Sequence, residues 1–377
     1  MRRTKMRRTA LAAVAVSALF LSACGGDSSD DAADTGETAA EASEETADEQ
    51  DAAAETSEET ADEQEATVEP VVVYSGRGEE LVDPLFTDFT AETGIPVEVR
   101  YGDTAELAAQ IIEEGDASPA DLYFGQDAGA LGALDSAGQC APLPAEVIDI
   151  VPAAYRSADG NWTGITGRAR VIAYDSSQLS ADEVPTSVFE LTDPKWAGQV
   201  AIAPTNGSFQ AFVTAMRVAA GDDATREWLQ GMVDNDAQLY EKNGLIRDGV
   251  DAGEVQLGLI NHYYWYRKAA EVGEDQLNVR VAFTEPGDPG TLVNVAGACV
   301  IAPSDNTEGA EELLTWMLSD ETQQWFVENT FEYPLAPGVP GPAGAPAFEE
   351  VQGPDIPLAE LEDLPGTLQM LQDVGLT

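Results

Sequence analysis

Strand-like and helix-like segments alternate along the chain after residue 70, and this alternation limits the fold more than any other feature. The segments are a strand at 71–74, a helix at 79–92, a strand at 97–101, a helix that starts near 103–104 and a strand at 120–124. This order requires crossover connections, which place strands parallel and helices on both faces of a sheet. We therefore expect an α/β fold with mostly parallel sheets.

A second set of the same kind follows. Its segments are strands at 171–175, 199–203 and 256–261, helices near 208–220 and 222–233, and a strand-like stretch at 291–302. A chain that visits two sheets in turn predicts two lobes joined by crossing strands near 166–173 and 291–298, with a ligand cleft between the lobes. The expected lobe 1 comprises 70–170 and about 294–344, and the expected lobe 2 comprises about 171–293 and 345–377.

The first 24 residues are typical of a secretion signal. Five Lys and Arg residues precede an apolar run at 10–21, which is too short for a stable membrane helix. The run ends in Leu21-Ser22-Ala23-Cys24, which resembles the lipobox of bacterial lipoproteins, where the cysteine carries lipid and becomes the first mature residue. We expect Cys24 to anchor the exported protein to the outer face of the cell membrane. An ordinary cleavage site with an incidental cysteine is the alternative.

Residues 25–69 differ in composition from the rest of the chain. They contain 18 Asp and Glu residues, no Lys or Arg, and two copies of SEETADEQ, at 43–50 and 57–64. Such a segment cannot bury enough apolar surface to offset the entropy of ordering it. We expect a disordered acidic tether between the membrane and the folded part.

The composition excludes several classes of function. The chain has 69 acidic and 18 basic residues, and a net charge of −51 excludes nucleic-acid binding and a basic lipid-binding patch. One histidine and three cysteines exclude most zinc, haem and iron–sulfur sites, so a bound metal would have mainly oxygen ligands. We find no glycine-rich phosphate loop, nucleophile elbow or pair of catalytic histidines in the sequence, and we do not expect an enzyme.

The stretch NHYYWYR at 261–267 ends a strand pattern and opens a helix. Adjacent phenols at such a turn can both face a cleft, and phenolate oxygen is a strong ligand for a hard ion such as Fe(III). Because the ordinary pKa of a phenol is about 10, iron must displace the protons of Tyr263 and Tyr264, and binding should weaken as pH falls. Aromatic clusters also pack into cores or stack on organic ligands, and these alternatives stay open.

The segment PTNGSF at 204–209 lies between a strand pattern and a helix pattern. Amide and hydroxyl groups at a helix N-terminus form an anion pocket, and the candidates here are Asn206, Gly207 and Ser208. A plain helix cap is the alternative.

Three arginines at turns or crossing points are expected to face an anion, with an ion pair as the alternative. Arg77 follows the first strand, and Arg168 and Arg170 precede the strand at 171–175. Separately, Cys140 and Cys299 are the thiols that remain beside Cys24, and export to an oxidising compartment favours a disulfide between them over two free thiols.

Nine segments, taken in order, carry a family resemblance. They are VVVYSGRGEELV at 71–82, FTAETGIPVEV at 89–99, PADLYFGQD at 119–127, TGRARVIAYD at 166–175, APTNGSFQAF at 203–212, LYEKNGLI at 239–246, NHYYWYR at 261–267, GDPGTLVNVAGA at 287–298 and EYPL at 332–335. They resemble the ferric-iron-binding solute receptors of bacterial ABC importers, within the two-lobed periplasmic-binding-protein class.

The resemblance implies a receptor that opens and closes around Fe(III) and a carbonate-like anion, and that delivers the iron to an ABC importer permease in the membrane. We expect it to act as a monomer. Tyr263 and Tyr264 would be the iron ligands. The anion site would comprise Arg77, Asn206, Gly207, Ser208, Asn243, Asn261 and Arg267.

This chain departs from the family pattern at two ligand positions. Relatives carry a histidine and a glutamate where this sequence has Gly78 and Gln126. The remaining iron coordination would come from a bidentate anion, from water, or from Gln126 or Asp127, and we interpret the change as a different coordination shell. A receptor of the same fold for an organic solute, stacked on Tyr263, Tyr264 and Trp265, is the alternative.

We predict that Cys24→Ala releases the protein from the membrane, because the substitution removes the thioether that would carry the lipid. Membrane fractionation of expressing cells measures this, and we expect the variant to move into the soluble exported fraction. An unchanged membrane fraction would rule out the anchor.

Overall fold

The computed structural model describes residues 68–377. The signal segment, Cys24 and all but the last two residues of the expected tether lie outside the described residues. Within the described range, no helix is long and apolar enough to cross a membrane.

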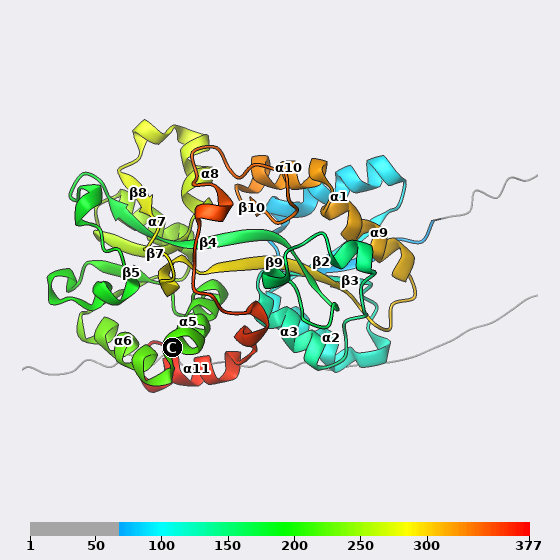
Figure 1. Ribbon diagram of the computed structural model, residues 1–377, viewed down its shortest axis with the longest axis horizontal. Helices are drawn as coiled ribbons and strands as arrows, with labels where there is room; N and C mark the ends of the chain where they lie inside the picture. The colour runs from blue at the N-terminus through cyan, green and yellow to red at the C-terminus, as the bar shows by residue number, and fades with distance from the viewer. Residues whose placement is uncertain (1–67) are drawn as a thin grey trace, which may run out of the picture. The chain divides into compact units, whose positions relative to one another are not determined.

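The first half of the fold agrees with the alternation in the sequence (Figure 1). Its elements are β1 (Val71–Ser75), α1 (Glu79–Thr93), β2 (Val97–Tyr101), α2 (Thr104–Glu114), β3 (Leu122–Gly125) and α3 (Ala128–Ser136). β1 pairs in parallel with both β2 and β3. Asp103 begins α2 by accepting hydrogen bonds from the backbone N–H groups of Ala105 and Glu106, which otherwise lack partners at a helix start.

The second half repeats the scheme around α5 to α8. Its elements are β5 (Val200–Ile202), α5 (Gly207–Ala220), α6 (Asp222–Asp234), β6 (Gln238–Leu239), α7 (Asn243–Asp251), β7 (Leu257–Asn261), α8 (Tyr263–Val272) and β8 (Val279–Ala282). β5 pairs in parallel with β6 and β7. Each half therefore has parallel outer strands covered by helices.

Two long strands connect the halves. β4 (Thr163–Asp175) pairs with β9 (Val293–Val300) over residues 163–169, and with β7 over residues 170–174. All 13 residues of β4 are buried. The strand starts eight residues before the expected one, because glycine and arginine in TGITGRAR conceal it from a pattern based on apolar residues.

The strand order is β2-β1-β3-β9-β4-β7-β5-β6, and both β8 and β10 (Tyr333–Pro334) pair with β4. The α/β class is as predicted. The expectation of mostly parallel pairing holds for the outer strands and is wrong at the centre, where β3–β9, β9–β4, β4–β7, β4–β8 and β4–β10 are antiparallel. The reason is that β4 and β9 carry the chain across and back, so they run in opposite directions.

The last part of the chain passes over both halves. After β9 come α9 (Thr307–Met317), α10 (Asp320–Thr330) and β10, and then a long segment that includes η9 (Leu358–Glu362) and α11 (Leu364–Asp373). In Figure 1 this segment, in red, runs from beside β10 across β4 and β9 to α3 and then to α5.

The apolar core follows this plan. A large cluster of buried apolar side chains covers the sheet in both halves and includes Phe89, Trp162 and Phe212. A second cluster, which includes Ile260 and Trp265, fills the space between β4, β7 and α8. The two crossing strands therefore lie between packed layers, which holds their cleft-facing side chains in place.

Cys140 and Cys299 form a disulfide with Cα atoms 5.6 Å apart. Cys299 lies on β9 and Cys140 in the loop that forms a bridge to Ile301, so the bond ties a loop of lobe 1 to a crossing strand. The two cysteines are 159 residues apart in sequence, and a crosslink over that length removes much of the freedom of the unfolded chain.

Replacing both cysteines, as Cys140→Ser with Cys299→Ser, should lower the free energy of unfolding by about 2–4 kcal/mol, because the unfolded chain regains that freedom. Urea unfolding followed by tryptophan fluorescence measures the change, with Cys24→Ser as the control that leaves the bond intact. An unchanged unfolding midpoint would show that the bond does not stabilise the fold.

Candidate functional site

Tyr263 and Tyr264 open α8 directly after β7, at the carboxyl end of the strand. Their rings stack with centroids 4.3 Å apart, and Tyr263 is buried while Tyr264 is half-buried. Burial, with a smaller contribution from Tyr264, raises the pKa of Tyr263 well above its ordinary value, although Arg168 opposes the shift. The Tyr263 phenol therefore holds its proton until a strong cation displaces it.

The single histidine has a structural place beside these phenols. His262 is fully buried, accepts a hydrogen bond at Nδ1 from the Ala169 N–H at 3.2 Å, and stacks on the Tyr333 ring with centroids 4.7 Å apart. Burial lowers the pKa of His262 to about 4. Neutral His262 therefore packs the start of α8 against β4, at the point where β4 changes partner from β9 to β7.

The predicted anion residues come together at the N-terminus of α5. Asn206 caps the helix, and its Oδ1 accepts hydrogen bonds from the Ser208 N–H at 3.2 Å and from the Asn243 side chain at 3.0 Å. Asn243 also donates to the Ser208 hydroxyl at 3.1 Å, and Gly207 is the first residue of α5. Asn243 is buried, and its own Oδ1 has no hydrogen-bond partner among the described residues.

Arg168 and Arg170 lie two residues apart on β4, so their side chains leave the same face of the strand. Both are at most 2% exposed, and neither has a carboxylate within 4 Å in the described part of the chain. Arg168 donates to the Val295 carbonyl at 3.1 Å, and Arg170 donates to Leu259 O at 3.2 Å and to the Ser208 hydroxyl at 3.3 Å. Neither cation has a carboxylate of the described chain in direct contact, although the charges of Glu332 and Asp127 act on Arg168, and a bound anion would offset part of the cost of burying them.

Burial also changes the acidity of both guanidinium groups. It lowers the pKa of Arg170 to about 9 and lowers that of Arg168, for which the nearby charge of Arg77 acts in the same direction. The Nε atoms of Arg168 and Arg170 have no hydrogen-bond partner among the described residues. These two buried donors therefore have unused hydrogen-bonding capacity within residues 68–377.

Arg77 takes part in a buried ion pair. Its Nη2 lies 2.7 Å from Oε1 of Glu332, and the Thr166 hydroxyl donates to Oε2 at 2.6 Å. Burial raises the pKa of Glu332, but the charges of Arg77 and Arg168 and these hydrogen bonds outweigh it, so the pKa is lower than usual. Arg77 therefore forms an ion pair through Nη2, as the alternative to an anion contact predicted. Its Nη1 has no partner among the described residues.

Glu332 was not predicted as a site residue. It begins the EYPL segment, which carried the family resemblance, but its partner Arg77 is 255 residues away in sequence. Its charge bears on the pKa values of Tyr263 and Arg168, so it belongs electrostatically to the site. In the sequence Glu332 lies between Phe331 and Tyr333, and an acid between two aromatic residues is the one local signal that could have found it.

Gln126 and Asp127 lie on lobe 1 where β3 ends. Gln126 donates from its side chain to Gly76 O at 2.7 Å, and Asp127 caps α3 by accepting from the Ala130 N–H at 3.0 Å. Burial raises the pKa of the half-buried Asp127, against the effect of the α3 backbone and Arg168. Each side chain keeps one oxygen that makes no hydrogen bond to the described residues.

Asn261 and Arg267, the remaining predicted anion residues, differ in burial. Asn261 is buried at the end of β7 and stands opposite Arg170 in the strand register. Arg267 is exposed one turn along α8, and no described hydrogen bond or ion pair joins it to the group around Ser208. We leave Arg267 out of the site that we propose below.

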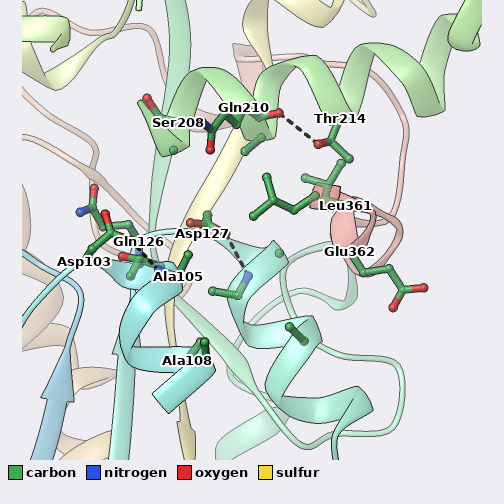
Figure 2. Close-up of a pocket in the computed structure, with 18 of the residues that line it drawn as sticks. Asp103, Ala105, Ala108, Gln126, Asp127, Ser208, Gln210, Thr214, Leu361 and Glu362 are labelled. Atoms are coloured by element: carbon green, nitrogen blue, oxygen red, sulfur yellow. Dashed lines mark hydrogen bonds between the residues drawn. The ribbon is translucent and has the colours of Figure 1, made fainter. Parts of the chain in front are cut away.

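A cavity of about 400 Å³ lies between α2 and α3 on one side and α5 on the other. Figure 2 shows Asp127 and Ser208 on its opposite walls, and Leu361 of η9 at one end. Arg168 and Gln126 also line it, whereas Tyr263 and Tyr264 are not among its lining residues. The cavity therefore adjoins the tyrosines through the arginine and the α5 N-terminus.

Residues 117–350 match the family described as bacterial extracellular solute-binding protein. The chain belongs to this family. The resemblance found in the sequence is thereby confirmed, as is the expectation of a solute-binding protein that is not an enzyme.

Several relatives of this solute-binding protein have names that refer to iron. The chain is 32% identical over 307 residues to the Fe(3+)-binding periplasmic protein of Serratia marcescens, covering 81% of this chain and 90% of that protein. It is 35% identical over 296 residues to iron uptake protein A1 of Synechocystis, covering 77% and 82%. Iron-bound HitA from Pseudomonas aeruginosa has a TM-score of 0.78 at 34% identity, covering 82% of this chain and 100% of that one, and is two-lobed like this fold.

We predict that Glu332→Gln lowers the free energy of unfolding at pH 7 by about 3–5 kcal/mol, because it leaves the Arg77 charge buried without a partner. The pKa of Glu332 is lowered in the folded chain, so the ion pair adds stability above pH about 4.5, and this is lost as pH falls through the folded pKa. The difference between wild type and variant should therefore shrink on acidification. Urea unfolding at several pH values measures it.

The matched control is Glu321→Gln, which removes an exposed carboxylate from α10 and should leave the unfolding midpoint nearly unchanged. Equal effects of the two substitutions would show that the buried ion pair adds no more stability than an exposed carboxylate does. A difference that does not depend on pH would contradict the lowered pKa.

Proposed function

We propose that this protein is a lipid-anchored extracytoplasmic receptor that captures Fe(III) together with an oxyanion such as carbonate and delivers the iron to an ABC importer. One observation carries the proposal: stacked Tyr263 and Tyr264 lie beside buried arginines that have no carboxylate partner in the described chain. Two phenolates leave a single positive charge on Fe(III). A divalent oxyanion makes the complex negative, which suits the neighbouring Arg168 and Arg170.

Different residues around the cleft would bind the iron and the anion. Tyr263 and Tyr264 would coordinate the iron, while Asn206, Gly207, Ser208 and Asn243 would hold the anion at the α5 N-terminus, where the helix dipole favours negative charge. Asn261 and Arg170 would complete this pocket from β7 and β4. Arg77 would offer from lobe 1 its Nη1, which has no partner in residues 68–377.

Lobe 1 offers two candidate iron ligands, Gln126 and Asp127. Gly78 and Gln126 replace the histidine and glutamate expected from the family, so the protein offers fewer charged ligands from that side. Asp127 is the half-buried carboxylate in the cavity, and its raised pKa would fall when a metal cation binds next to it. Gln126 can contribute a neutral oxygen.

Closure follows from where these groups lie. Ligands drawn from both lobes bind the closed form better than the open form, and only such a difference can shift the equilibrium between them. We place the hinge at residues 169–170 of β4 and 292–293 near the start of β9, with the lobe boundaries expected from the sequence. The names of the relatives, which are iron-binding and iron-uptake proteins, support the same cargo.

A receptor for an organic solute is the second candidate, and the cavity favours it in part. Its walls include alanines of α2, α3 and α5, and its volume suits a small organic anion. A related structure, Trichodesmium IdiA, is described as a complex with iron and citrate ligands, with a TM-score of 0.72 at 26% identity. Trp265, however, is buried in the second core cluster and donates to Val279 O at 2.7 Å, so it packs inside its lobe.

We predict that Tyr263→Phe with Tyr264→Phe abolishes Fe(III) binding and leaves the fold intact, because phenylalanine keeps the stacked rings and removes both oxygen ligands. Titration of the full chain with chelated Fe(III) and bicarbonate measures this through the visible charge-transfer band of iron–phenolate. Wild type should saturate near one iron per chain, and the double variant should show no band.

The matched control is Tyr266→Phe on the same helix, since its hydroxyl faces Gly344 O at 3.3 Å rather than the cleft. This variant should keep the full band. Tight iron binding by the double variant would refute the assignment, and binding of an organic anion without iron would favour the second candidate.

A further inference from the structure

The segment after residue 344 touches the hinge and both sides of the cleft. Gly353 packs so closely on Thr291 O, beside the start of β9, that a Cβ atom would collide with the carbonyl. Farther on, η9 contacts both α3 of lobe 1 and α5 of lobe 2, and α11 contacts α5. Leu361, Glu362, Leu364 and Pro365 also line the cavity, so this segment closes one end of it (Figure 2). We call residues 345–377 the strap.

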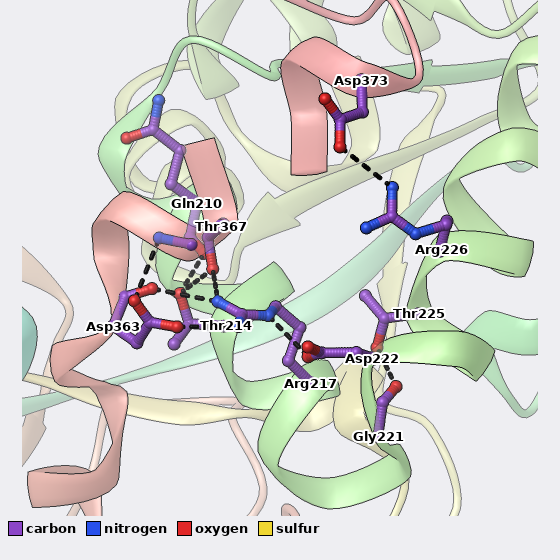
Figure 3. Close-up of polar contacts among 11 residues, drawn as sticks. Gln210, Thr214, Arg217, Gly221, Asp222, Thr225, Arg226, Asp363, Thr367 and Asp373 are labelled. Atoms are coloured by element: carbon purple, nitrogen blue, oxygen red, sulfur yellow. Dashed lines mark hydrogen bonds and ion pairs between the residues drawn. The ribbon is translucent and has the colours of Figure 1, made fainter. Parts of the chain in front are cut away.

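The strap is joined to α5 by polar contacts. Arg217 donates to the Asp363 carboxylate at 2.8 Å, to the Asp363 carbonyl at 3.0 Å and to the Thr367 hydroxyl at 3.0 Å (Figure 3). The hydroxyls of Thr367 and Thr214 are hydrogen-bonded at 2.8 Å in a buried position. Arg226 pairs with Asp373 one helix farther on, at 3.3 Å. Several directional contacts therefore fix α11 to lobe 2.

The contact with α3 is of a different kind. Leu358 and Leu361 of η9 are 3% and 2% exposed, and the Leu361 carbonyl lies over Gly129, where no side chain intervenes. The only side-chain hydrogen bond between η9 and α3 among the described residues is a long one of 3.4 Å, from Ser136 to Glu362. Apolar packing without directional bonds can separate and re-form at little cost in geometry.

We propose that the strap is a latch for the cleft: α11 stays attached to α5, while η9 docks on α3 when the lobes close and leaves it when they open. The strap cannot keep its contacts with both helices while α3 and α5 move apart. The contact of η9 with α3, which is apolar apart from the long Ser136–Glu362 hydrogen bond, is the one that yields. Docking thus adds to the stability of the closed form and slows the release of cargo. This inference rests on the proposed function for its cargo, Fe(III).

The first test weakens the docked end. Leu358→Ala with Leu361→Ala should make iron release to a competing chelator about tenfold faster, because the part of the apolar contact made with α3 had stabilised only the closed form. The control is Leu368→Ala, which makes the same change at an exposed position of α11 and should leave the rate unchanged. Equal release rates in the two variants would overturn the proposal.

The second test fixes the docked end. A Cβ atom at Gly132 would lie 3.8 Å from Cβ of Glu362, which is the usual separation in a disulfide. Gly132→Cys with Glu362→Cys should therefore crosslink η9 to α3 and slow both iron entry and iron release at least about tenfold relative to the uncrosslinked Gly132→Ser, Glu362→Ser pair. Iron exchange at equal rates in the crosslinked and serine proteins would show that undocking is not needed for opening.

A third measurement does not depend on iron. Spin labels at Glu113→Cys on α2 and Glu227→Cys on α6, in a Cys24→Ser chain, report the separation of the lobes, and both sites are exposed. Without iron, the alanine pair at 358 and 361 should shift the distances to longer values, and Leu368→Ala should not. The same distances in all chains would overturn the latch, whereas a failure of iron binding with the expected shift would overturn only the proposed function.

Discussion

The structure depends on β4, a single buried strand that belongs to both halves of the sheet. Its first seven residues pair with β9 and its next five with β7, so any movement of one lobe against the other must pass through Ala169 and Arg170. The backbone hydrogen bonds on both sides hold the strand in register, and that register fixes where its side chains enter the cleft.

The same strand carries the charges that define the site. Arg168 and Arg170 leave one face of β4, one near Tyr263 and the other at the α5 N-terminus. Burying two guanidinium groups with no carboxylate of the described chain in direct contact lowers the stability of the protein alone, and a bound anion would recover part of that cost in the loaded form. The buried pair of Arg77 and Glu332 is neutral as a whole and holds its members in place. The site that we propose would therefore suit an anionic complex before any ligand arrives.

Much of this was predictable from the sequence where local signals are strong. The strand at 97–101 has the predicted bounds, and Asn206 to Ser208 lie at a helix N-terminus as the PTNGSF segment indicated. Apolar periodicity and capping residues act over a few neighbours, so one sequence contains them. The paired phenols also lie at a strand-to-helix turn, as NHYYWYR predicted.

Other features depend on contacts between distant parts of the chain. The start of β4 was not recognised, because its glycines and arginines are not apolar. They are buried because neighbouring strands and side chains cover them. Glu332 and Arg77 are far apart in sequence and come into contact only in the folded chain. The segment η9 is too short for a periodic pattern to predict its contact with α3. The antiparallel centre of the sheet likewise follows from the path of the chain and not from the pattern of any one strand.

The most direct test of the central claim is an iron-edge anomalous difference map from crystals of the full chain grown with Fe(III) and bicarbonate. We predict one iron peak bonded to the hydroxyl oxygens of Tyr263 and Tyr264, with an oxyanion between it and the N-terminus of α5, within reach of Arg170. An iron peak away from these phenols, or an organic molecule between the lobes without iron, would contradict it.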